Sequence, residues 1–185
     1  MSKENADKEQ KRSFKREVFS WIACIVVTIL LTEFILNFVI INANIPSGSM
    51  ENTIMTNDKL IALRTSYWFN DPKRGDIIIF KYPDDETEWF IKRVIALPGE
   101  TVLVKDGKVY INGSKKALSE PYIKEEPVED FGPYDVALED DEYFVMGDNR
   151  NNSNDAREWE THYVSRDEVL GKAWFRYYPS IKVIK

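Results

Sequence analysis

The chain has 185 residues, a length that suits one domain with a short appendage. Its residues are 43% hydrophobic and 30% charged, which is typical of a globular protein, and the net charge of −6 argues against a nucleic-acid-binding surface. A single cysteine (Cys24) and a single histidine (His162) exclude an internal disulfide and a Cys/His metal site.

The first predicted element is an apolar run of 24 residues, Val18–Ile41. As a helix it would be roughly 36 Å long, enough to cross a hydrocarbon core of about 30 Å. The run exceeds the apolar core of ~7–15 residues in a cleaved signal peptide, and Asn42-Ala43-Asn44 is a poor cleavage site. We therefore predict a retained transmembrane helix over residues 18–41.

Basic residues predict the orientation of this helix. Six Lys and Arg residues lie within residues 1–17, and none follows until Lys59. By the positive-inside rule, residues 1–17 are a cytoplasmic segment and residues 42–185 are an extracytoplasmic domain with 19 basic and 26 acidic residues. The sequence thus predicts a single-pass type II protein of the plasma membrane, in contact with membrane lipid.

Glu33 lies inside the predicted span, where an ionised carboxylate costs a few kcal/mol. Two interpretations stay open: a contact with a membrane partner such as the protein-translocation machinery, or a protonated or snorkelling side chain near the outer leaflet. Cys24 suits a small apolar position in the helix.

The exported part has the pattern of antiparallel β structure. Six short runs have the length, the apolar content and the flanking turns of strands: Asp76–Phe80, Trp89–Ile95, Thr101–Lys105, Lys108–Ile111, Glu142–Met146 and Lys172–Tyr178. Asp106-Gly107 is the signal of a two-residue type I′ hairpin. We expect a mainly β fold, an antiparallel β-sheet domain behind one N-terminal transmembrane helix.

Two further segments complete the prediction. A short helix is expected at Ser165–Leu170, because Ser165 and Glu168 have the spacing of a capping box. Pro121–Asp141 is acidic and contains prolines, so we expect a surface loop there.

The usual catalytic motifs are absent from the sequence: no HExxH, Walker or dinucleotide glycine pattern occurs. A serine triad would have to use His162, which has no flanking signature and fits a surface or structural role. A thiol nucleophile would have to be Cys24, inside the predicted membrane span. What remains is a serine with an unusual base.

Lys92 differs from the other lysines, because it lies within the apolar run Trp89–Ile95. A lysine can act as a base only when neutral, and burial can lower its pKa by up to about 3–5 units. The spacing alone favours an ordinary lysine of an edge strand over a catalytic one.

Four segments, in this order, resemble the ordered boxes of bacterial type I signal peptidases of the compact Gram-positive type, which are serine proteases with a Ser/Lys dyad: Pro46–Met50, Arg74–Phe80, Phe90–Gly99 and Gly147–Arg157. Taken alone, the last segment is an Asp/Asn-rich turn. The resemblance extends over nearly the whole exported part, and it implies a β-sheet catalytic domain similar to that of signal peptidases and repressor-type autoproteases.

The resemblance implies a role for each matching residue. Ser49 would be the nucleophile and Lys92 the general base, with Ser153 hydrogen-bonded to Lys92 to orient it. The backbone N–H of Ser49 and the hydroxyl of Ser47 would form the oxyanion hole. Asp148, Arg150, Asp155 and Arg157 would be structural, with Asp155 and Arg157 forming an ion pair.

The implied substrates are exported preproteins, cut after a small-x-small site of the signal peptide. An extended peptide would lie alongside Asn44–Ser47 and against Trp89–Ile91. The substrate-binding residues are then Ile45, Pro46, Phe90 and Ile91, and pockets lined by Ile45 and Ile91 would admit only small side chains. The reaction needs no metal and no organic cofactor.

The sequence departs from the family pattern at three positions. Asn52 stands where proline is common, Ala96 where glycine is frequent and Ala156 where serine is frequent. None of them removes a catalytic atom.

Two alternatives stay open, one from another class of function and one a protease of related fold. One is a membrane-anchored, non-catalytic peptide-binding β module or inactive paralogue, against which intact Ser49 and Lys92 speak. The other is a Ser/Lys autoprotease, whose targets would be cytoplasmic, on the wrong side of the predicted anchor. Cleavage of preproteins discriminates both from a signal peptidase.

Overall fold

The computed structural model describes residues 3–127 and 135–184, with side chains from residue 14 onward, and it divides into two units, Met1–Val39 and Ile40–Lys185. The first unit is helical: α1 (Lys3–Phe34) continues into one π-helical segment, η1 (Ile35–Val39). Phe14–Val39 is long and apolar enough to cross a membrane. A strand begins at Ile40, so the last two residues of the predicted span belong to the second unit.

Glu33 has a partner on its own helix. The side-chain amide of Asn37 donates to the backbone carbonyl of Glu33 at 2.9 Å and to its carboxylate at 3.1 Å. Thr28 donates to the carbonyl of Cys24 at 2.8 Å in the same manner. These polar groups are satisfied within the helix, as a lipid environment requires. A second protein is not needed to give the Glu33 carboxylate a hydrogen bond.

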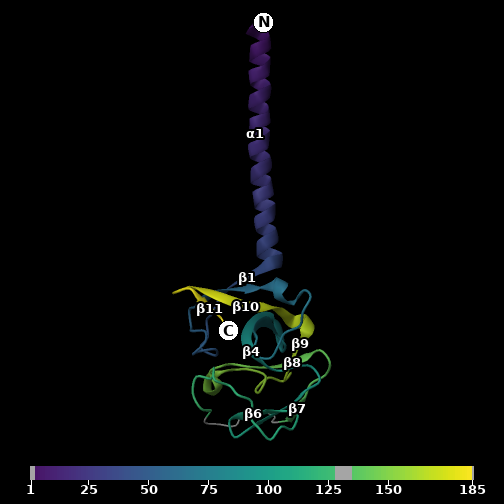
Figure 1. Ribbon diagram of the computed structural model, residues 1–185, viewed down its shortest axis with the longest axis vertical. Coiled ribbons are helices and arrows are strands. Elements are labelled where there is room, and N and C mark those ends of the chain that lie inside the picture. Colours follow the sequence, from purple (N-terminus) through teal and green to yellow (C-terminus); the bar gives the residue numbers. More distant parts are fainter. Residues whose placement is uncertain (1–2, 128–134, 185) are drawn as a thin grey trace. The chain divides into compact units, whose positions relative to one another are not determined.

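The second unit is built on an eight-stranded antiparallel sheet with the order β1-β2-β10-β3-β4-β8-β9, in which β11 pairs with β10 (Figure 1). Its strands are β1 (Ile40–Asn44), β2 (Lys59–Leu63), β3 (Ile77–Tyr82), β4 (Asp85–Ala96), β8 (Glu142–Met146), β9 (Val164–Ser165), β10 (Val169–Tyr178) and β11 (Lys182–Val183). β4 has twelve residues and changes partner along its length. It pairs with β3 up to Arg93 and with β8 from Arg93 onward.

A smaller antiparallel sheet has the order β6-β5-β7 and lies at the other end of this unit from β1 (Figure 1). Its strands are β5 (Thr101–Lys105), β6 (Lys108–Ile111) and β7 (Asp135–Ala137). Three short 3-10 helices complete the unit: η2 (Arg64–Tyr67), η3 (Arg150–Asn152) and η4 (Arg166–Glu168).

The expected antiparallel β fold and all six predicted strands are confirmed, three of them with the predicted bounds. The hairpin at Asp106-Gly107 is confirmed as well, because both residues have the positive φ that a type I′ turn requires, 52° and 69°.

Two predictions were wrong in part. The helix at Ser165–Leu170 is a single 3-10 turn; its capping box is present, but Val169 pairs with Phe80 and begins β10. Strand pairing therefore ends the helix that the capping box begins. Pro121–Asp141 is not entirely loop, because β7 lies within it and pairs with β5; residues 128–134 are outside the described residues.

The core consists of two hydrophobic clusters on either side of β3. Ile78 and Phe80 belong to one cluster, and Ile77 and Ile79 belong to the other. Successive strand residues point to opposite faces, so a strand buried on both faces is apolar throughout. Lys92 on β4 lies opposite Ile78 in the register and is therefore surrounded by this core.

Candidate active site

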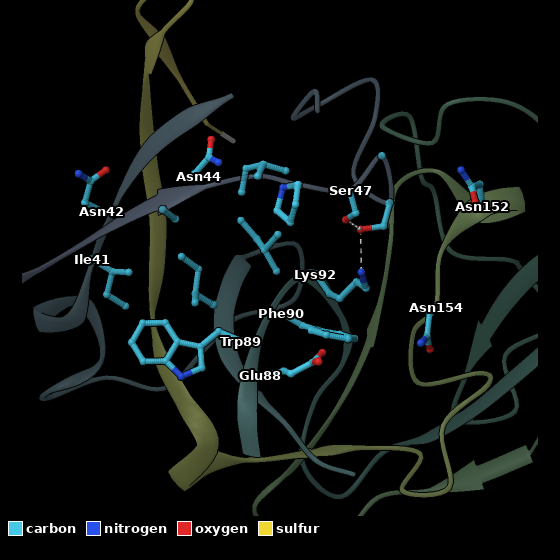
Figure 2. Close-up of a pocket in the computed structure, with 17 residues that line it drawn as sticks. Ile41, Asn42, Asn44, Ser47, Glu88, Trp89, Phe90, Lys92, Asn152 and Asn154 are labelled. Atoms are coloured by element: carbon cyan, nitrogen blue, oxygen red, sulfur yellow. Dashed lines mark hydrogen bonds between the residues drawn. The ribbon is translucent and has the colours of Figure 1, made fainter. Parts of the chain in front are cut away.

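Ser49 and Lys92 meet through a direct hydrogen bond. Lys92 Nζ donates to Ser49 Oγ at 2.7 Å, across 43 residues of sequence (Figure 2). Ser49 lies in the turns that follow β1, whereas Lys92 comes from the middle of β4. Both are buried, with 6% and 4% of their surface exposed. Lys92, whose role the sequence spacing alone does not decide, is thus hydrogen-bonded to a buried hydroxyl group.

Burial lowers the pKa of Lys92 from its ordinary 10.5 to about 8. The negative charge of Asp155 raises this pKa, and the positive charge of Arg157 lowers it by a smaller amount than burial does. At pH 7 roughly one Lys92 side chain in ten is then neutral. A neutral amine beside a serine hydroxyl is a base within reach of its proton.

The segment Gly147–Arg157 is organised around the buried carboxylate of Asp155. The Gly147 N–H and the Ser153 hydroxyl donate to Asp155 Oδ2 at 2.9 and 2.7 Å. Arg157 Nε donates to Asp155 Oδ1 at 2.8 Å, which is the predicted ion pair. Burial alone would raise the pKa of Asp155, but the hydrogen bond and charge of Arg157, together with the other donors, hold it below its ordinary value.

Ser153 lies beside the dyad, but its proton is used elsewhere. The hydroxyl donates to Asp155, and the hydrogen bonds of the described residues include none between Ser153 and Lys92. The predicted contact therefore differs from the observed one. A carboxylate accepts a hydroxyl proton, whereas an ammonium group can only donate, and this sets the direction of the Ser153 bond. The orienting role of Ser153 stays a prediction.

Asp148 and Arg150 are buried in two further ion pairs. Asp148 accepts two hydrogen bonds from Arg93, at 2.8 and 2.7 Å. Arg150 is paired with Glu120 and also donates to the carbonyl of Gly147 at 3.1 Å. A buried charge without a partner would be strongly destabilising, so these pairs fix the segment in place. Arg93 and Glu120 had no assigned role in the sequence prediction.

Gly147 is a site residue that the sequence prediction missed. A Cβ at this position would lie 2.2 Å from Ser153 Oγ and 2.4 Å from the backbone oxygen of Ser49. Only a residue without a side chain allows these two segments to approach so closely. The turn-rich composition around Gly147 gave no signal of this contact.

A cleft of about 660 Å³ opens beside the dyad (Figure 2). Residues 41–49 line one side and residues 88–92 line the other, so the four predicted substrate-binding residues all contribute: Ile45, Pro46, Phe90 and Ile91. Among the described strands, β1 pairs only with β2, and β4 pairs with β8 only from Arg93 onward. Each side of the cleft therefore offers an unpaired strand edge, the feature to which an extended peptide can add.

The other candidate groups lie outside this arrangement. His162 Nδ1 lies 2.8 Å from the carbonyl oxygen of Ala156, and His162 is not among the residues that line the cleft. Within the part of the chain that the structure describes, no group of three His, Cys, Asp or Glu side chains could hold a metal ion.

Comparisons with known proteins agree with this geometry. The profile of the family described as signal peptidase, peptidase S26, matches residues 18–178. A probable signal peptidase I-2 of Synechocystis sp. is 43% identical over 163 residues, covering 85% of this chain and 72% of that protein. The signal peptidase I of Bacillus amyloliquefaciens is 34% identical over 187 residues, covering 96% and 97%.

A solved structure of a signal peptidase I from Enterococcus faecalis V583 is 33% identical, with a TM-score of 0.47, over 56% of this chain and 97% of that one. From the family profile and the curated relatives, the chain belongs to the signal peptidase family, peptidase S26.

We expect Gly147→Ala to lower peptidase activity at least about 100-fold, because a displacement of about 1 Å at reacting groups costs that much. The added methyl group must push away either Ser153 or the Ser49 backbone. The measurement is peptide cleavage by the solubilised full chain, with Gly113→Ala as the control, a change that strains the backbone at a φ of +66° but adds a methyl group with no atom within 4 Å. Equal rates for Gly147→Ala and the wild type would contradict the tight contact.

Proposed function

We propose that this chain is a membrane-anchored serine endopeptidase that removes N-terminal signal peptides from exported preproteins, with Ser49 as nucleophile and Lys92 as general base. The observation that carries the proposal is the buried 2.7 Å hydrogen bond between Lys92 Nζ and Ser49 Oγ at the cleft. Membership of the signal peptidase family and the names of the relatives support the substrate class.

The reaction is acyl transfer in two steps. Neutral Lys92 takes the Ser49 proton, and Ser49 Oγ attacks the scissile carbonyl carbon. The C–N bond then breaks, and Lys92 gives its proton to the leaving amine. A water molecule, deprotonated by Lys92, attacks the ester, and Lys92 returns the proton to Ser49 as the acyl group leaves.

The oxyanion of the tetrahedral intermediate needs donors that are already in place. The Ser49 N–H and the Ser47 hydroxyl are the proposed donors, and Ser47 Oγ lies 3.4 Å from Ser49 Oγ. Removal of one such donor commonly costs about 3–4 kcal/mol of the barrier. Asp155 would hold Ser153 in place through its hydrogen bond. Asp148, Arg150 and Arg157 would hold the segment in position through their ion pairs.

Substrate would bind as an extended strand between the two free strand edges. Ile45 and Ile91 belong to the same buried cluster and both line the cleft, so their side chains limit the space for a substrate residue. Pro46 and Phe90 complete the proposed contact surface. Small residues before the scissile bond suit such narrow pockets.

The apolar helix supports membrane anchoring. The apolar part of Phe14–Val39, from Val18 onward, is the proposed anchor, and the six basic residues before it favour a cytoplasmic location of residues 1–17 under the positive-inside rule. Residues 42–185 would then be extracytoplasmic, giving a type II protein of the plasma membrane in contact with lipid and within reach of the translocation machinery. Eight chain steps separate Ile41 from Ser49, and this stretch can span at most about 29 Å.

A non-catalytic peptide-binding module is not favoured. Binding a peptide between strand edges needs no lysine buried against a serine hydroxyl, and burying an amine is costly. A role for the Ser49–Lys92 contact follows only if Lys92 takes the proton of Ser49.

The decisive test compares preprotein cleavage by Ser49→Ala, Lys92→Met and His162→Ala. We expect the first two to lose activity by at least about 10⁴-fold, since each removes a member of the reacting pair. Lys92→Met keeps an apolar stem of similar length, so it preserves the packing of β4. His162→Ala should remain active. Normal cleavage by Lys92→Met would show that the base lies elsewhere.

The rate should depend on pH through Lys92. Because the base must be neutral and its pKa is about 8, kcat/KM should rise from pH 6 to pH 9 with a midpoint near 8. Below the midpoint, acidification should lower the rate about tenfold per pH unit. A profile that is flat over this range would count against a lysine base.

Narrowing the pockets should block cleavage without unfolding the protein. Ile45→Trp or Ile91→Trp fills space that a substrate side chain requires, so we expect at least about a tenfold loss of kcat/KM. Ile181→Trp, at a position 83% exposed, is the matched control for adding an indole ring. If both cleft variants process preprotein at the wild-type rate, the assignment of these pockets is wrong.

A further inference from the structure

We propose that Asn149 is a positioning residue that sets the direction of the oxyanion-hole N–H of Ser49; the inference rests on the proposed Ser49–Lys92 mechanism. Asn149 is 1% exposed and belongs to the segment after β8. It is not among the residues that line the cleft, so it would act on the substrate only through Ser49.

Asn149 holds both carbonyl groups that flank Ser49. Its side-chain amide Nδ2 donates to the carbonyl oxygen of Gly48 at 2.9 Å, across 101 residues of sequence. Its backbone N–H donates to the carbonyl oxygen of Ser49 at 3.0 Å. One buried residue therefore fixes the peptide unit before the nucleophile and the one after it.

The bond to Gly48 bears directly on the oxyanion hole. The Gly48 carbonyl and the Ser49 N–H belong to one planar trans peptide unit, in which they point in opposite directions. Holding the Gly48 oxygen therefore fixes where the Ser49 N–H points. Among the described residues this N–H donates no hydrogen bond, which leaves it available for a substrate oxyanion.

The Gly48 oxygen has a second, local donor. The N–H of Glu51 lies 3.1 Å from it and closes the turn that carries Ser49. This turn bond is made within the same segment as the nucleophile, whereas Asn149 comes from a separate segment that buried ion pairs hold in place. The neighbours of Asn149 are Asp148, paired with Arg93, and Arg150, paired with Glu120. Asn149 thus transmits the rigidity of these pairs to the Gly48–Ser49 peptide.

The carbonyl oxygen of the Asn149 side chain, Oδ1, makes no hydrogen bond among the described residues, which supports a donor role for the amide nitrogen. This oxygen is buried. An unpaired buried acceptor is unfavourable. Since only the amide nitrogen of the side chain makes a contact, the donation to Gly48 is what the asparagine contributes here.

The test uses Asn149→Leu in the full-length, detergent-solubilised protein. Leucine has nearly the shape of asparagine and lacks the donor, while the backbone N–H bond to Ser49 remains. Asn149→Ala removes the same donor without adding an apolar branch, so it covers the case in which leucine disturbs the fold. Asn151→Leu makes the same change two residues away, where the amide reaches the carbonyl of Glu126 instead.

For both Asn149 variants we expect kcat on a preprotein-derived peptide to fall about 10- to 100-fold, because a displaced donor stabilises the transition state less. The affinity for a peptide boronate, which forms a tetrahedral adduct on the serine, should fall by a similar factor. KM and the midpoint of the pH profile should stay at wild-type values, since substrate binding and Lys92 are not altered, and Tm should fall by only about 2–4 °C, as the loss of one hydrogen bond predicts. Asn151→Leu should behave as the wild type.

Four results would overturn the inference: an unchanged kcat, a loss of boronate affinity no larger than the change in KM, an equal loss in Asn151→Leu, or a fall in Tm so large that the Asn149 variants unfold at the assay temperature. The last result would assign Asn149 a merely structural role. Ser49→Ala distinguishes a failure of the proposed function from a failure of this inference alone. If Ser49→Ala still cuts, the proposed function itself fails; if it is inactive while the Asn149 variants cut normally, only this inference fails.

Discussion

The burial of one amine beside one hydroxyl is the constraint on which the rest of the site depends. Lys92 is 4% exposed and donates to Ser49 at 2.7 Å, and its burial is the main reason that its pKa is about 8. A solvated lysine at neutral pH would be almost entirely protonated and could not act as a base. The fold must therefore keep water away from Lys92 while leaving Ser49 at the cleft, and it does so by placing the lysine within a strand whose neighbours are core residues.

Nearby negative charge limits how far the pKa of Lys92 can fall. The Asp155 carboxylate raises the pKa of Lys92, and an ionised carboxylate without a cation of its own would raise it further. Arg157 provides that cation, and its charge also lowers the pKa of Lys92. The Asp155–Arg157 pair thus lets a buried acceptor hold Ser153 and the Gly147 backbone without forcing Lys92 to stay protonated. The pair serves the chemistry as well as the packing.

Local signals in the sequence predicted the strands and the hairpin, because those features depend on neighbouring residues. Asp106-Gly107 specifies its turn by itself, whereas the capping box at Ser165 begins a helix that pairing between Val169 and Phe80 ends. Strand β1 was hidden because its two apolar residues, Ile40 and Ile41, directly continue the apolar run of the preceding helix. The pairing of Ser49 with Lys92 and of Asp155 with Arg157 was predicted through the resemblance to a family, and both contacts are present. Gly147 and Asn149 were not assigned a role, because their contacts with Gly48, Ser49 and Ser153 are set by tertiary structure and leave no pattern in nearby residues.

The alternation of β4 explains how one strand can supply several parts of the site. Phe90 and Lys92 point to one face, and the Lys92 ammonium lies 5.4 Å from the Phe90 ring. Ile91 and Arg93 point to the other: Ile91 joins the buried cluster that also contains Ile45, and Arg93 holds Asp148. The proposed base, the proposed pocket wall and the anchor of the segment with Asn149 therefore occupy three successive positions, and a register shift of one residue would exchange their faces. Pairing with β3 on one side and with β8 beyond Arg93 prevents such a shift, while the free edge before Arg93 stays open for a peptide.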